Sequence, residues 1–79
     1  MGKKIDLGVA FGIALRKLRI SMDLTQEQLG FEAGLRRTYI SSLELGQKMP
    51  SLETLHKLST VFNMPISKFL QFVEVELKR

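Results

Sequence analysis

The sequence predicts a compact all-α domain built from five short helices. Apolar residues recur at three- and four-residue spacings along most of the chain, which is typical of amphipathic helices. Residues that begin or end helices interrupt this pattern at short intervals, at Thr25, Gly34, Gly46, Ser51 and Asn63. A chain of 79 residues suits one domain with a small hydrophobic core, so we expect residues 1–79 to fold as a single unit.

The first helix is predicted to begin near Asp6. Its apolar face follows the i, i+3, i+4, i+7 spacing and comprises Phe11, Ala14, Leu15 and Leu18. Its later turns carry three cations, which favour the negative end of the helix dipole: Arg16, Lys17 and Arg19.

The second and third helices are predicted from their ends. Thr25 and Gln28 form a capping-box pattern, in which the Thr25 hydroxyl accepts a backbone hydrogen bond while Gln28 reaches back. This second helix ends at Gly34, a residue that favours the left-handed conformation after a helix, and its inward residues are Leu29 and Ala33. The third helix covers about residues 36–45 and ends at Gly46.

The fourth and fifth helices follow two prolines. Ser51 is the predicted N-cap of the fourth helix, whose apolar stripe is Leu52, Leu55, Leu58 and Phe62. Pro65 opens the fifth helix, predicted over about residues 65–78, with the apolar face Ile66, Phe69, Leu70 and Val73. Residues 73–77 alternate apolar and charged side chains, a pattern as typical of a strand as of a helix, so both remain open.

Composition narrows the classes of function. Twelve Lys and Arg against eight Asp and Glu give a net charge of +4, which suits a polyanionic partner such as nucleic acid or an acidic membrane. No apolar run is long enough to span a membrane, and the first residues lack a signal-peptide pattern, so we expect a cytoplasmic protein. Without Cys and with His56 alone, we expect no disulfide, metal site, cofactor or enzymatic activity.

Residues 25–45 have the pattern of a helix-turn-helix, two short helices joined by a tight turn that contains glycine. On a helical wheel, one face of the third helix gathers Tyr39, Ile40 and Leu43. The opposite face gathers Arg37, Thr38, Ser41, Ser42 and Leu45. Short polar side chains with one Arg suit a helix in the DNA major groove, where Arg can bind guanine and Ser or Thr can bind either base type.

Arg36 and Arg37 lie where cations oppose the helix dipole, at a cost of about 0.3–1 kcal/mol each. Arg36 also stands where a capping hydroxyl or Asn is preferred. A docked polyanion would offset these local costs, so we interpret both residues as DNA contacts.

Residues 11–70 resemble the helix-turn-helix domain of the Cro/cI repressor (Xre) family, a lambda-repressor-like DNA-binding fold. The matching strings are Leu15-Arg16-Lys17-Leu18-Arg19, Leu24-Thr25-Gln26-Glu27-Gln28-Leu29, Thr38-Tyr39-Ile40-Ser41-Ser42-Leu43-Glu44-Leu45-Gly46 and Pro50-Ser51-Leu52-Glu53-Thr54-Leu55. The string Arg37-Thr38-Tyr39-Ile40-Ser41 also resembles the recognition helix of restriction–modification controller proteins.

The resemblance implies a role for individual residues. Base contacts are expected from Arg37, Thr38 and Ser42, and phosphate contacts from Gln26, Tyr39, Gln47 and Lys48. Arg19 and Glu44 match a pair that forms an ion pair between the first and third helices. Gly30 departs from the usual Ala inside the second helix and is expected to cost about 0.8–1 kcal/mol. Asp23 replaces a common turn glycine and can adopt the left-handed conformation.

The last third of the chain carries more apolar side chains than one small domain can bury. We expect a homodimer interface comprising Met64, Phe69, Phe72, Val75 and Leu77. The overall expectation is a bacterial or phage transcriptional regulator that is associated with the nucleoid. It is expected to bind a pseudo-palindromic double-stranded DNA operator without a small-molecule effector, and to control restriction–modification genes. The alternative is a helical protein–protein interaction module, antitoxin-like or an adaptor, whose apolar last helix binds a partner.

Overall fold

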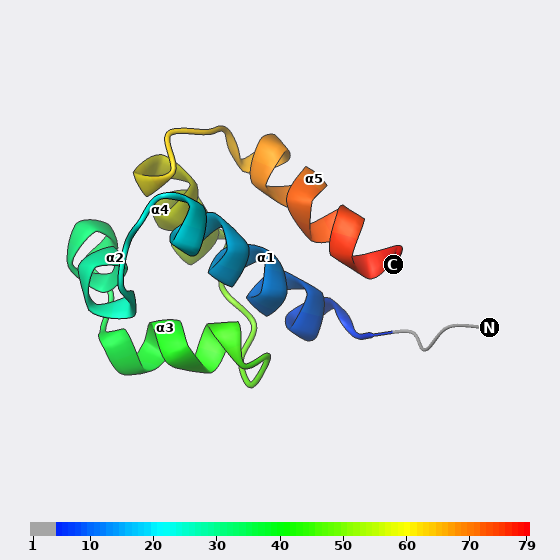
Figure 1. Cartoon of the computed structure of the whole chain (residues 1–79), viewed down its shortest axis with the longest axis horizontal. Helices are drawn as coiled ribbons and strands as arrows, with labels where there is room; N and C mark the ends of the chain where they lie inside the picture. The colour runs from blue at the N-terminus through cyan, green and yellow to red at the C-terminus, as the bar shows by residue number, and fades with distance from the viewer. Residues whose placement is uncertain (1–4) are drawn as a thin grey trace.

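A computed structural model describes residues 5–79; residues 1–4, part of the start of the chain that lacks a signal-peptide pattern, lie outside this range. The described part of the chain forms five α-helices, as the sequence predicts: α1 (Leu7–Ser21), α2 (Gln26–Ala33), α3 (Arg37–Glu44), α4 (Leu52–Val61) and α5 (Ile66–Leu77). Figure 1 shows α1 crossing the middle of the molecule, with α5 along one side and α3 along the other. Residues 73–77 are helical, which decides the choice that the sequence left open.

The predicted helix ends are confirmed by their hydrogen bonds. The Gln28 N–H donates to Thr25 Oγ1 over 3.0 Å, and the Thr25 N–H donates to Gln28 Oε1 over 2.8 Å, which completes the capping box. The Thr54 N–H donates to Ser51 Oγ over 3.0 Å at the start of α4. Asp23 and Asn63 adopt the left-handed conformation with φ of 59° and 56°, as short polar side chains permit.

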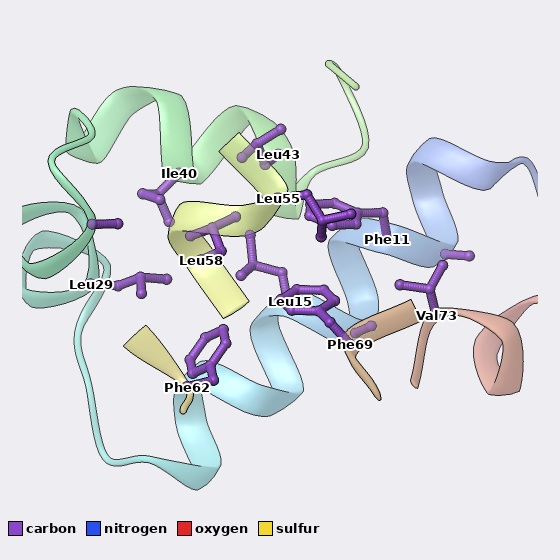
Figure 2. Packing of buried hydrophobic residues seen from close by; sticks show 13 residues of the cluster. Phe11, Leu15, Leu29, Ile40, Leu43, Leu55, Leu58, Phe62, Phe69 and Val73 are labelled. Carbon is purple, nitrogen blue, oxygen red and sulfur yellow. The ribbon is translucent and has the colours of Figure 1, made fainter. Parts of the chain in front are cut away.

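The core lies where α1 meets the other helices, and Figure 2 shows its side chains. The Phe11 and Phe69 rings stack with their centroids 5.3 Å apart, and the Phe62 ring lies 5.9 Å from Phe69 on the other side. Leu15 and Leu58 are fully buried beside them. This cluster holds α1, α4 and α5 together, while Leu29, Ile40 and Leu43 attach α2 and α3.

Two residues that the sequence assigned to apolar faces are exposed. Leu52 lies in the first turn of α4, where the described chain leaves 73% of the residue uncovered. Leu70 is 40% exposed because α5 turns Phe69, Val73 and Glu76 toward the core instead. The buried face of α5 therefore contains a carboxylate, which the sequence pattern did not predict.

Candidate nucleic-acid interface

The turn between α2 and α3 is held tightly against α2. Gly34 ends α2 with φ of 71°, in the left-handed conformation that glycine adopts without strain. The Leu35 N–H then donates to the Gly30 carbonyl over 2.8 Å. A Cβ on Gly30 would lie 2.5 Å from the Leu35 carbonyl oxygen, closer than atoms can approach. The expectation that Gly30 makes the protein less stable than Ala would is therefore wrong, because the turn requires a residue without a side chain.

A second glycine sets the distance between α1 and α3. A Cβ on Gly12 would lie 2.4 Å from the Leu43 carbonyl oxygen and 2.6 Å from that of Glu44. The last turn of α3 consequently packs directly on the backbone of α1. The turn at Gly30 holds the start of α3, and this contact with Gly12 holds its end against α1.

The two faces of α3 separate as the helical wheel predicts. Ile40 and Leu43 are fully buried, and Tyr39 is half-buried against the core. The outward face presents the residues expected to contact DNA: Arg36, Arg37 and Thr38 are exposed, and Ser41 and Ser42 are partly exposed. The α3 helix therefore offers a row of polar side chains along the surface of the domain.

The start of α3 carries uncompensated positive charge. Arg36 is the N-cap and makes no side-chain capping bond, and the first turn contains no acidic residue. None of the ion pairs within residues 5–79 includes Arg36 or Arg37. These two cations remain at the positive end of the α3 dipole, an arrangement that an anionic ligand would stabilise.

The Ser42 hydroxyl donates a hydrogen bond within its own helix. Its Oγ donates to the Thr38 carbonyl oxygen over 3.0 Å. A hydroxyl that has donated its proton keeps its acceptor lone pairs. Ser42 therefore presents an acceptor to the outside, complementary to the amino groups of adenine or cytosine in the major groove.

Arg19 and Glu44 form the ion pair that the family resemblance implied. Arg19 Nε donates to Glu44 Oε2 over 2.6 Å and a terminal nitrogen donates to Oε1 over 3.0 Å, while the other terminal nitrogen donates to the Leu24 carbonyl over 2.9 Å. The two side chains are 12% and 4% exposed. The bonds from Arg19 to Glu44 raise the pKa of Arg19, so the guanidinium stays charged.

Gln26 belongs to the same network, which the sequence did not indicate. Its Nε2 donates to Glu44 Oε1 over 3.0 Å. The network thus joins the end of α1, the start of α2 and the end of α3. The bond to Glu44 also fixes the orientation of the Gln26 amide, so that Nε2 lies at this edge of α3. This nitrogen carries a second N–H that can donate.

The loop after α3 exposes Gln47 and Lys48. Gly46 has φ of 73°, and the Gln47 N–H donates to the Ser42 carbonyl over 3.0 Å, which turns the chain sharply at the end of the helix. Both residues therefore lie beside the last turn of α3, in the loop to which the family resemblance assigns phosphate contacts.

The expected dimer residues divide into three groups by burial. Phe69 is fully buried between Phe11 and Phe62, so its assignment to an interface is wrong. Met64 is half-buried against the core. The exposed members are Phe72, Val75 and Leu77, with exposed fractions of 37%, 51% and 36%. Phe72 and Val75 line a groove of about 470 Å³ between α1 and α5.

Within residues 5–79, no helix is long and apolar enough to cross a membrane. In the same range, no group of three or more His, Cys, Asp or Glu side chains is arranged to hold a metal ion.

A family model described as helix-turn-helix matches residues 15–69. The chain belongs to this helix-turn-helix family, of the Cro/cI type. The control protein C.BamHI of Bacillus amyloliquefaciens is 34% identical over 71 residues, covering 89% of this chain and 88% of the relative. The control protein C.MunI of a Mycoplasma species is 38% identical over 72 residues, covering 90% and 97%.

A solved structure has the same fold. The restriction–modification controller protein C.AhdI from Aeromonas hydrophila aligns with a TM-score of 0.76 and 39% identity, over 78% of this chain and 94% of that chain. The protein described here is accordingly a DNA-binding transcriptional regulator with an all-α helix-turn-helix fold.

Proposed function

We propose that this protein controls restriction–modification genes by binding a pseudo-palindromic operator as a homodimer, with α3 in the major groove. The observation that carries the proposal is the outward face of α3, where Arg36 and Arg37 stand uncompensated beside a row of short polar side chains. The similarity to control proteins along nearly the whole chain supports the type of circuit.

The proposed contacts combine the exposed positions on α3 with the roles that the family resemblance implies. Arg37 and Thr38, exposed in the first turn of α3, contact base edges, and Ser42 contacts a base one turn later. Phosphates are bound by Arg36 and by four further side chains around α3: Gln26, Tyr39, Gln47 and Lys48. Ser41 contributes a second hydroxyl on the same face.

The proposed homodimer places two copies of α3 on one side of the DNA. A two-fold axis through the exposed side chains of α5 would present two recognition helices, which read half-sites about 34 Å apart, one turn of DNA. Phe72 and Val75 supply apolar surface for this contact. The protein has no catalytic role in this proposal, as its relatives are regulators, and it acts on nucleoid DNA in the cytoplasm.

The deciding experiment selects bound sites from random duplex DNA and measures the salt dependence of binding. A pseudo-palindromic consensus is expected, with log affinity falling linearly against log salt at a slope of about −0.9 for each phosphate contact. Failure to bind any duplex at low salt would refute the proposal and favour a protein–protein interaction module. A single, non-repeated half-site would refute the dimeric mode alone.

A further inference from the structure

We infer that Arg16 is an additional phosphate-binding residue, which extends the DNA interface from α3 onto α1; the inference rests on the proposed function. Arg16 lies in a crevice of about 200 Å³ at the crossing of α1 and α3, together with Gln26, Ser41 and Leu45. Gln26 and Ser41 already belong to the proposed interface. Arg16 therefore lies on the side of the domain that faces the DNA.

The ion pairs of α1 single out this residue. Of the three cations in the second half of α1, Lys17 pairs with Glu76 over 2.8 Å and Arg19 pairs with Glu44 over 2.6 Å. Arg16 takes part in no ion pair within residues 5–79, although it is only one turn from Arg19. The fold thus pairs Lys17 and Arg19 with carboxylates and leaves Arg16, beside α3, without a counter-charge in the described chain.

The helix dipole does not account for Arg16. A cation gains from the dipole only in the last turn, and in α1 that turn contains Arg19. Arg16 is exposed and makes no side-chain hydrogen bond to the described chain, so its guanidinium is available for a ligand.

The rest of the crevice fits a phosphate and its sugar. Glu44 also lines it, but both Glu44 oxygens accept hydrogen bonds, from Arg19 and Gln26, so its charge is compensated. The second N–H of the Gln26 amide and the Ser41 hydroxyl can donate to phosphate oxygens. Leu45, 66% exposed, offers apolar surface to a deoxyribose. Arg19 lines the crevice too, but it is paired with Glu44, so Arg16 supplies the unpaired positive charge.

The test compares Arg16→Ala with Lys57→Ala, which removes an exposed cation from α4 outside the crevice. Affinities for the selected operator and for a random duplex are measured across a salt series. For Arg16→Ala we expect the magnitude of the log–log slope to fall by about 0.9 and both affinities to fall roughly eightfold at 0.1 M salt. Lys57→Ala should leave the slope unchanged, and Arg16→Lys should keep it because the charge is retained.

Four results would overturn the inference. Equal slopes for Arg16→Ala and Lys57→Ala would show only a loss of net charge. A loss confined to the selected operator would make Arg16 a base contact instead. Suppose that the unaltered protein binds DNA with a salt-dependent slope, and that Lys48→Ala lowers the magnitude of this slope while Arg16→Ala does not. This inference then fails and the proposed function stands. If the unaltered protein binds no DNA at low salt, both fail.

Discussion

Glu44 accepts hydrogen bonds from Arg19 through both of its oxygens, at 2.6 and 3.0 Å, in an ion pair that joins the end of α1 to the end of α3. The Gln26 amide donates to the same carboxylate, so one side chain links three helices. The orientation of the recognition helix and the position of a proposed phosphate contact thus depend on a single carboxylate. We therefore expect stability and DNA binding to be coupled at this point.

Glu44→Ala should therefore lower the free energy of unfolding by about 3 kcal/mol, because Arg19 would remain largely buried without its counter-charge. Urea denaturation measures the change, with Glu74→Ala, an exposed glutamate on α5, as control. The double variant Arg19→Met with Glu44→Met should cost less than the sum of its single changes, since no charge is stranded. A loss below about 0.5 kcal/mol for Glu44→Ala would contradict this view of the pair.

Gly30→Ala should destabilise the protein, although helix propensity alone predicts a gain of about 1 kcal/mol. The added Cβ would meet the Leu35 carbonyl at 2.5 Å, and relieving that contact displaces the turn before α3. Thermal unfolding should show a lower Tm, accompanied by weaker DNA binding.

Gly34→Ala is the matched control for that change. No atom lies within 4 Å of the new Cβ there, so only the left-handed backbone is strained, at a cost of roughly 1–2 kcal/mol. An increase in Tm for Gly30→Ala would show that the turn can move away without loss.

These glycines illustrate which features the sequence can predict. The Thr25 capping box and the Gly34 helix end involve atoms within a few residues, so local patterns are enough to find them. Gly30 contacts a carbonyl that the following turn brings back, and Glu76 meets Lys17 across 59 positions of the chain. Such contacts depend on how helices pack, which periodicity does not specify. The sequence also places Phe69 wrongly at an interface, because its apolar character fits a core and an interface equally.

The acid sensitivity of the fold should depend on Glu76. A hydrogen bond from Lys17, the charges of Arg79 and Lys17 and a hydrogen bond from Arg79 lower the pKa of this buried carboxyl, against the opposing effect of burial. A lowered pKa in the folded state adds stability above the ordinary value of 4.5, and this contribution disappears as the pH falls through the folded-state pKa.

Glu76→Gln should consequently be less stable than the unaltered protein at pH 7, with the difference in Tm shrinking as the pH falls below 4.5. Calorimetry between neutral and acidic pH measures both curves. Glu74→Gln, on the exposed side of α5, should instead run parallel to the unaltered protein. A constant difference between Glu76→Gln and the unaltered protein at all pH values would show that protonation of Glu76 is not coupled to folding.

The proposed dimer interface is tested by Phe72→Glu. This residue is 37% exposed at the α1–α5 groove, so a carboxylate should leave the fold intact but oppose burial against a second copy. Sedimentation equilibrium at micromolar concentration should change from dimer to monomer, and affinity for the full operator should fall more than affinity for one half-site. Leu52→Glu, at a 73% exposed position on α4, should remain dimeric. An unaltered protein that sediments as a monomer both with and without DNA would exclude this interface.

Base reading and phosphate binding should separate in Arg37→Ala and Lys48→Ala. Arg37 lies in the first turn of α3, where its guanidinium can bind guanine O6 and N7, so its loss should relax the preference at one base pair by about 1–3 kcal/mol. Lys48 lies in the loop after α3, and its loss should weaken all sequences alike and reduce the salt slope by about 0.9. Competition binding against operators substituted at each position measures both effects. If Arg37→Ala weakens every substituted operator equally, Arg37 binds phosphate, and the bases are then read by Thr38 and Ser42 alone.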